Sequence, residues 1–288
     1  MARTKALLIA FALLAAACSR PPRVIVGSKN FTEQVLLGEI LSQQIERRMH
    51  VAVERKLDLG GTLLAHEALV RGDIDLYPEY TGTALTAILK QQPGGSPVDV
   101  LEQVRVAYRA RWHLLWEPPL GFNDTFAMMV RGADARRDHL ESVSDAARAH
   151  AWKLGVGYEF QQRPDGLSGL VRAYGLRTQG APVSMDLGLL YTALEKGSVD
   201  MIAANSTDGL ASAKGVAILA DDRHFFPPYQ CAVVLRQDAL VRFPSLGFVL
   251  GELSGKISDG AMRRMNYEVD GKHRPVSEIA REFLKDIR

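Results

Sequence analysis

The chain has 288 residues, of which 47% are hydrophobic and 24% are charged, and its formal net charge is +2. This composition is typical of a folded globular protein and argues against a disordered chain. The basic residues are scattered and form no stripe, so the charge pattern predicts no nucleic-acid partner.

The N-terminal residues have the pattern of an export signal. Arg3 and Lys5 precede an unbroken apolar run over 6–17, which ends in the small residues of a cleavage site. About a dozen apolar residues are too few to span a bilayer, which needs roughly 20. We therefore predict a signal peptide over 1–17, a tether over 18–22 and a mature protein in the periplasm.

Cys18 directly follows this cleavage site and resembles the lipid-modified cysteine of bacterial lipoproteins, although the leucine usual three positions earlier is here Ala15. Lipid attachment at Cys18 and plain cleavage both remain open. The other cysteine, Cys231, then has no partner for a disulfide and is predicted to be a small core residue. No later run of about 18 apolar residues occurs, so we predict no membrane-spanning segment after the signal, and any membrane subunit would be a separate chain.

The first predicted unit after the tether is a strand followed by a helix. The run 23–26, which is apolar after Arg23, is a candidate for a buried strand that ends at Gly27. Apolar residues then recur at helical spacing from Val35 to Ile45, and Asn30 with Glu33 three residues later fits a capping box.

A second unit of the same kind follows. The run 51–59 is a strand candidate, Gly60 breaks it, and a helix is predicted from Thr62 until Gly72. A third short strand is predicted over 74–77. Strands that alternate with helices indicate parallel pairing, so we predict an α/β fold.

The same plan returns about 125 residues later. The segment 68–75 resembles 193–200 at a constant offset, and 24–27 has a counterpart near 153–157. Chance matching remains an alternative, but a real repeat implies two similar α/β lobes that face each other across a cleft. Because ligands bind beyond the carboxyl ends of strands in open α/β sheets, the equivalent residues Tyr80 and Asn205 are expected to face this cleft.

The repeat also predicts the domain organisation. We expect lobe 1 to comprise 23–121 plus 224–288 and lobe 2 to comprise 122–223. The chain then crosses between the lobes twice, near 120–127 and near 221–229, and two crossings can act as a hinge.

Five ordered motifs carry a resemblance to a known family. They are VGSKNFTEQ at 26–34, DLYPEYTGT at 75–83, PLGFNDT at 119–125, STDG at 206–209 and FPPY at 226–229. Together they are similar to the osmoprotectant-binding proteins of glycine betaine, carnitine and choline ABC importers. The resemblance implies a periplasmic-binding-protein-like fold of type II, in which two α/β lobes close on a small quaternary-ammonium solute.

The resemblance also implies which residues bind that solute. An aromatic cage for the trimethylammonium group would include Tyr80 with Thr83 beside it, Phe126 and Tyr229, with Asp124 close to the ligand. A quaternary nitrogen has no N–H to donate, so ring faces are the groups that best attract it. For a ligand carboxylate, the family pattern points to Lys29 and Arg163.

Asn205 departs from the family pattern, because relatives with a full cage carry a tyrosine there. An amide has no aromatic face, and a cation–π contact is worth about 0.5 to 2 kcal/mol. Since about 1.4 kcal/mol is a factor of ten in affinity, we expect weakened binding or a somewhat different solute.

The sequence does not carry the motifs of common enzyme classes. The seven histidines show no metal-ligand spacing, and neither H-E-x-x-H, G-x-S-x-G nor a Walker-type run is present. We therefore expect no catalytic residue, no metal, no cofactor and no enzyme. The alternatives left open are a binding protein of the same fold for an amino acid or another small zwitterion, and a solute sensor. The expected partners are the solute and inner-membrane ABC permease subunits, and the protein itself is expected to be a monomer.

Overall fold

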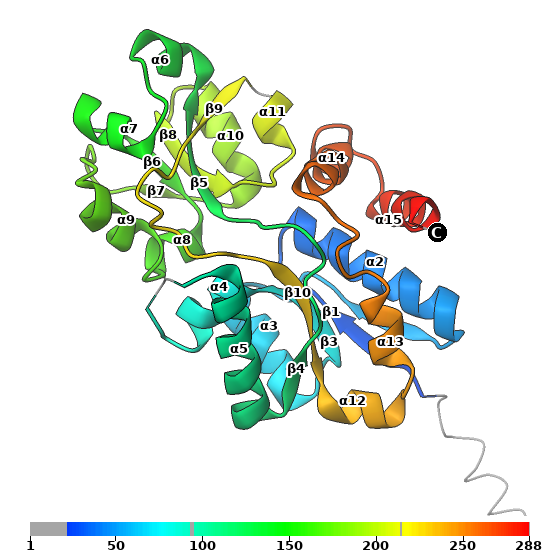
Figure 1. Ribbon diagram of the computed structural model, residues 1–288. Coiled ribbons are helices and arrows are strands. Elements are labelled where there is room, and N and C mark those ends of the chain that lie inside the picture. The colour runs from blue at the N-terminus through cyan, green and yellow to red at the C-terminus, as the bar shows by residue number, and fades with distance from the viewer. Residues whose placement is uncertain (1–21, 93–94, 214, 288) are drawn as a thin grey trace, which may run out of the picture.

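Two mixed β-sheets organise the part of the chain that the computed structural model describes, residues 22–92, 95–213 and 215–287 (Figure 1). The first sheet has the order β2-β1-β3-β10-β4, formed by Val53–Lys56, Val24–Gly27, Leu76–Tyr80, Cys231–Arg236 and Leu114–Trp116. The second has the order β7-β6-β8-β5-β9, formed by Val183–Ser184, Leu154–Val156, Met201–Asn205, Phe126–Arg131 and Val216–Leu219. The predicted signal peptide, Cys18 and most of the tether lie outside the described residues.

The two sheets have the same topology. In the first, β1 pairs in parallel with β2 and β3, while β10 runs antiparallel between β3 and β4. In the second, β6 pairs in parallel with β7 and β8, while β5 runs antiparallel between β8 and β9. The weak sequence repeat therefore reflects two α/β units of one design, as the constant offset predicted. The predicted α/β class is also confirmed.

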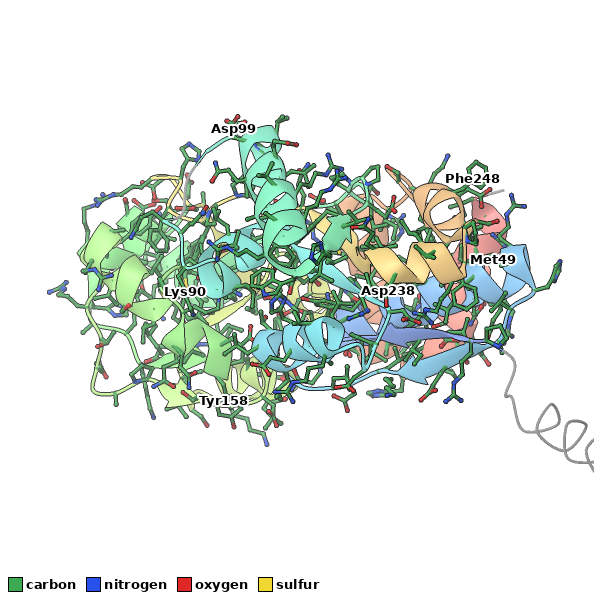
Figure 2. All side chains as sticks on the ribbon, turned by 90° about the horizontal axis from the view of Figure 1, so that it is seen from below. Met49, Lys90, Asp99, Tyr158, Asp238 and Phe248 are labelled. Carbon is green, nitrogen blue, oxygen red and sulfur yellow. The ribbon has the colours of Figure 1, made fainter. Side chains whose placement is uncertain are left out.

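Helices cover both faces of each sheet, which is why strands such as β3 are buried along their whole length. Around the first sheet lie α2 (Thr32–Met49), α3 (Thr62–Arg71), α4 (Thr81–Thr83), the π-helix η1 (Ala84–Ile88), α5 (Pro97–Trp112), α12 (Gln237–Arg242), α13 (Leu246–Gly251), α14 (Asp259–Asp270) and α15 (Val276–Asp286). Around the second lie α6 (Gly132–Arg137), α7 (Val143–Ala149), α8 (Tyr158–Gln162), α9 (Leu167–Tyr174), α10 (Leu187–Glu195) and α11 (Leu210–Ala213). In the view of Figure 2, Met49 and Phe248 lie toward one end of the molecule, whereas Tyr158 lies at the lower edge.

Each sheet has a hydrophobic core on either face. In the first sheet, Val24, Val26 and Val233 pack toward α2, α13 and α15, whereas Tyr77 and Val234 pack toward α3 and α5. This alternation along β10 follows from the two-residue period of a strand. Cys231 belongs to the first of these cores and is fully buried. This confirms the prediction that Cys231 is a small core residue.

Two connections cross between the sheets side by side. One leads from β4 to β5 and the other from β9 to β10, and they pair through an isolated bridge between Asn123 and Gln230. The Asp124 N–H donates to the Tyr229 carbonyl at 3.1 Å, and the Tyr229 N–H donates to Asn123 Oδ1 at 2.7 Å. The predicted lobe boundaries at 121/122 and 223/224 stay a prediction; they fall within these two connections.

Two local predictions were wrong. Helix α2 begins after Phe31, and no side chain caps it, so Asn30 and Glu33 form no capping box. The third strand runs over 76–80 rather than 74–77, and it carries the buried Glu79 at its fourth position. A buried carboxylate is unusual in a strand, and here Lys29 balances its charge.

Candidate ligand-binding site

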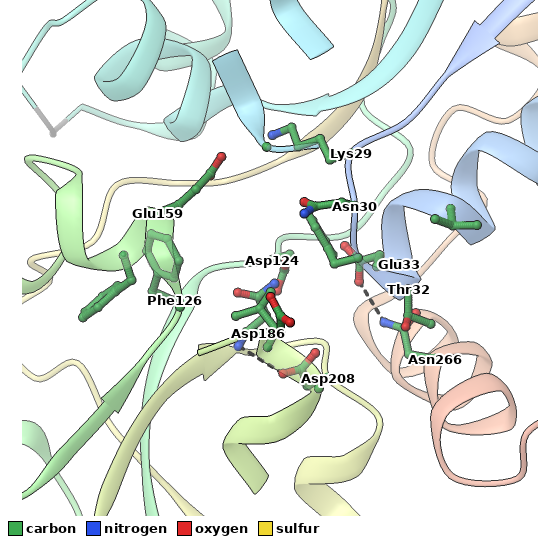
Figure 3. Close-up of a pocket in the computed structure, with 18 of the residues that line it drawn as sticks. Lys29, Asn30, Thr32, Glu33, Asp124, Phe126, Glu159, Asp186, Asp208 and Asn266 are labelled. Carbon is green, nitrogen blue, oxygen red and sulfur yellow. Dashed lines mark hydrogen bonds between the residues drawn. The ribbon is translucent and has the colours of Figure 1, made fainter. Parts of the chain in front are cut away.

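A cavity of about 500 Å³ lies between the two sheets, at the carboxyl ends of their parallel strands (Figure 3). Its wall includes Tyr80 at the end of β3, Asn205 at the end of β8, and Glu159 just after β6. Phe126 begins the antiparallel strand β5 and is paired with Asn205, so it reaches the same edge. This is the place where open α/β sheets hold their ligands.

All eight residues predicted to bind the ligand line this cavity. They are Lys29, Tyr80, Thr83, Asp124, Phe126, Arg163, Asn205 and Tyr229. The structure therefore brings together residues that lie up to 200 positions apart in the chain. That they contact a ligand stays a prediction.

Aromatic rings form one side of the cavity, which we call the aromatic side: Tyr80, Phe126, Phe160 and Tyr229. The ring of Phe126 meets that of Phe160 edge to face at 4.9 Å between centroids and that of Tyr229 at 5.8 Å. Tyr80 and Tyr229 are only 4% and 2% exposed. A cation on this side would lie among ring faces from elements of both sheets.

The two basic residues of the cavity are already paired inside the protein. Lys29 Nζ lies 2.6 Å from Glu79 Oε1, and the Arg163 guanidinium makes two bonds to Asp165, at 2.9 and 2.5 Å. The guanidinium holds the pKa of Asp165 below its usual range, despite burial. The charges that were expected to attract a ligand carboxylate are thus largely neutralised in place.

Arg163 also takes part in the aromatic side. Its guanidinium carbon lies 4.9 Å from the ring centroid of Phe126 and 5.8 Å from that of Tyr229. The Tyr229 hydroxyl donates to Asp165, which ties the ring to the same ion pair. Arg163 therefore fixes the orientation of two rings.

Carboxyl groups form an adjoining part of the wall, which we call the acidic side: Glu33, Asp124 and Asp208, with Asn266 beside them (Figure 3). Burial is the largest cause that raises the pKa of Glu33 and of Asp124, and it raises the pKa of Asp208 to about 7. Repulsion between these like charges acts in the same direction. The acidic side therefore holds protons more tightly than exposed carboxylates do.

Glu33 is the residue that sequence reasoning missed. Instead of capping α2, its carboxylate accepts hydrogen bonds from the hydroxyls of Tyr80 at 2.7 Å and Thr207 at 2.6 Å, and from Asn266 Nδ2 at 2.9 Å. These partners come from β3, the loop after β8 and α14. Its place inside the VGSKNFTEQ motif was a signal for this role, but the capping pattern offered a simpler local explanation.

Several hydrogen bonds join the two sides of the cleft, so the structure shows a closed arrangement. Thr62 donates to the Glu159 carboxylate through its N–H at 2.5 Å and its hydroxyl at 3.0 Å. Thr86 donates to Asp165 at 2.9 Å, and the Glu33–Thr207 bond joins α2 to the second sheet. Each bond links an element around the first sheet to an element around the second.

The described residues also limit other functions. None of their helices is both long and apolar enough to cross a membrane. Among these same residues, no group of three or more His, Cys, Asp or Glu side chains is arranged to hold a metal ion.

Known proteins share this architecture and sequence. The chain is 34% identical, over 96% of its length, to the ergothioneine transport permease/ergothioneine binding protein EgtU of Helicobacter pylori, of which it spans 51%. It is 32% identical to the carnitine transport binding protein OpuCC of Listeria monocytogenes, over 97% of this chain and 94% of that protein. A solved structure described as a glycine betaine/carnitine/choline ABC transporter matches with a TM-score of 0.77 and 33% identity, over 91% of this chain and 98% of that one.

This likeness extends over the whole fold, and the type II binding-protein architecture expected from the motifs is confirmed. The family described as the substrate-binding domain of the ABC-type glycine betaine transport system matches residues 22–286. The chain belongs to this family of substrate-binding proteins and is therefore a binding protein and not an enzyme.

Proposed function

We propose that the protein captures a small solute with a quaternary ammonium group outside the cytoplasm and delivers it to an ABC importer. The observation that carries this proposal is the set of aromatic rings, from elements of both sheets, around a cavity of about 500 Å³. A trimethylammonium group cannot donate an N–H hydrogen bond, so ring faces attract it better than neutral hydrogen-bonding groups do.

The charge of the cavity supports a cationic head group. Its wall contains seven acidic and two basic side chains, and both basic ones are paired with carboxylates. An anionic solute would meet repulsion on the acidic side. Relatives named for carnitine, glycine betaine and ergothioneine add support, because each of these compounds carries a trimethylammonium group.

Asn205 lies in the cavity wall opposite Phe126 on the neighbouring strand, so no ring closes that part of the cage. The missing contact is worth about 0.5 to 2 kcal/mol. We therefore expect weaker capture of glycine betaine than a full aromatic cage gives.

The mode of action follows from the hydrogen bonds across the cleft. In our proposal an open form receives the solute, and closure forms the bonds of Thr62 with Glu159 and of Glu33 with Thr207. The closed form then docks on separate permease subunits. Attachment to the membrane through a lipid on Cys18 is part of this proposal and rests on the sequence alone.

A ligand panel tests the proposal. We expect calorimetric titration with choline, glycine betaine, L-carnitine or ergothioneine to give saturable binding, and small-angle scattering to show compaction at saturation. Tyr229→Ala should weaken binding at least tenfold, while Tyr229→Phe keeps the ring and most of the affinity. If an amino acid raises the melting temperature and none of the quaternary amines does, the ligand class is wrong.

A further inference from the structure

A single carboxylate organises the start of the second connection between the sheets, residues 221–226, which we call the crossing loop. Asp221 follows closely after β9. Its Oδ1 accepts hydrogen bonds from the Tyr174 hydroxyl and, at 3.0 Å, from the Phe225 N–H, and its Oδ2 accepts one from the Phe226 N–H at 2.9 Å. Hydrogen bonds to an ionised carboxylate are stronger than those between neutral groups. Asp221 therefore fixes the main chain of the crossing loop at 225 and 226.

The crossing loop is also fastened to helix α9 beside the second sheet. Tyr174 is the last residue of α9 and is only 4% exposed. Its hydroxyl accepts from the Arg223 N–H at 2.9 Å, and the Arg223 guanidinium carbon lies 5.1 Å from the centroid of the Tyr174 ring. Phe225 packs over Gly169 of the same helix, so closely that a Cβ on Gly169 would lie 2.7 Å from the Phe225 ring. The position of the loop is thus set by α9.

Phe226 connects the crossing loop to the aromatic side of the cavity. Its ring centroid lies 6.0 Å from that of Phe126 and 6.5 Å from that of Phe160. Phe126 and Phe160 line the cavity, whereas Phe226 supports them from outside it. Phe226 also packs against the hydrophobic cores of both sheets. A shift of the main chain at 226 would therefore turn the two rings that it supports.

We propose that Asp221 is a positioning residue for ligand capture. Its carboxylate fixes the main chain that carries Phe226, and the Phe226 ring holds Phe126 and Phe160 in the orientation in which they meet a bound cation. The attraction between a cation and a ring depends on how far the cation lies from the ring face. Asp221 therefore acts on affinity through these rings, although it does not line the cavity. This inference rests on the proposed function, because it assumes that the quaternary head lies on the aromatic side.

Fluorine NMR of the mature protein tests the positioning without any ligand. para-Fluorophenylalanine replaces phenylalanine throughout, and single Phe→Leu substitutions assign the signals of Phe126 and Phe160. Asp221→Asn should move both signals, because an amide has one acceptor oxygen instead of two and turns an N–H₂ group toward another donor. Asp222→Asn is the matched control, since it makes the same change one residue later on a carboxylate that accepts from the Ser144 N–H, and it should leave both signals in place.

Calorimetric titration with choline, glycine betaine and L-carnitine measures the consequence for capture. All three carry the trimethylammonium group, so Asp221→Asn should raise the Kd of each one that binds the parent protein by the same factor, about three- to tenfold. Asp222→Asn should change these Kd values by less than about twofold. Tyr174→Phe removes only the hydroxyl that donates to Asp221 and replaces Asp221→Asn if that variant does not fold. It should move the same two signals and raise the same Kd values.

The outcomes separate this inference from the proposed function. Unmoved signals of Phe126 and Phe160 in a folded Asp221→Asn protein refute the positioning role, whatever the protein binds. Moved signals with unchanged Kd values show that the orientation of these rings does not control capture, so the inference is again refuted while the proposed function stands. If no quaternary amine of the panel binds the parent protein, the proposed function fails and this inference fails with it.

Discussion

Asp208→Asn is expected to stabilise the ligand-free protein at neutral and alkaline pH. Burial raises the pKa of Asp208 to about 7 from the value of 3.8 for an exposed aspartate. The folded protein therefore binds a proton that the unfolded chain has lost between these two values. In this window the free energy of unfolding falls as the pH rises, and above pH 7 the loss is complete.

The size of the effect follows from that difference in pKa. At about 1.4 kcal/mol per pH unit, the full difference corresponds to about 4 kcal/mol. Asp208 keeps some access to solvent, so we expect about 2 kcal/mol at pH 8 and nearly none at pH 4. Asparagine is neutral throughout and retains an oxygen that can accept from the Tyr191 hydroxyl.

Urea unfolding followed by tryptophan fluorescence between pH 4 and pH 8.5 measures this difference. The curve of the variant should rise above that of the parent protein as the pH increases, whereas Asp73→Asn should follow the parent curve. Parallel curves for the parent and Asp208→Asn would show that this carboxyl ionises normally in the folded state and would refute the reasoning.

Three further changes test other parts of the structure. Tyr229→Ala should raise the Kd of a bound quaternary amine at least tenfold, since it removes a ring from the aromatic side. An unchanged Kd in calorimetric titration would exclude an aromatic cage that includes Tyr229. Glu159→Gln removes the negative charge of the carboxylate that accepts two hydrogen bonds from Thr62. Small-angle scattering should then show less compaction of the variant than of the parent protein at the same ligand concentration. Equal compaction of the two proteins would mean that this contact does not hold the lobes closed. Gly209→Ala should lower the free energy of unfolding by about 1 to 3 kcal/mol, because the added Cβ would overlap a backbone nitrogen of α14. Gly251→Ala is the control, since the space around that residue is open, and it should change the free energy of unfolding little.

The sequence predicted the architecture well because strands, helix ends and the internal repeat are marked by residues that lie close together in the chain or by segments that recur. Glycine at the end of α3, the apolar runs of β1 and β6, and the match between 68–75 and 193–200 each report on nearby structure. The offset then implied a second unit without any knowledge of long-range contacts. The strand β3 was misplaced by a few residues, since it runs over Leu76–Tyr80 and not over 74–77.

The chemistry of the site was harder to predict, because charge pairing depends on distant partners. Lys29 and Arg163 were expected to have charges available for a ligand, but Glu79 lies 50 positions from Lys29 and neutralises it. Glu33 had a plausible local role at a helix start, and nothing in its own segment shows that Thr207 and Asn266 approach it. The sequence therefore predicts which charged residues line the site, whereas only the fold shows which of these charges are paired within the protein.

The buried thiol of Cys231 has a practical consequence for measurement. Apart from Cys18, it is the only cysteine in the chain, and burial raises its pKa, so it is shielded from alkylating dyes. Fluorophores attached to engineered cysteines in a Cys18-free protein, for example at the exposed positions Ile218 in β9 and Phe248 in α13, would therefore label one defined point beside each sheet. Energy transfer between such dyes would turn the protein into an optical sensor for its own solute.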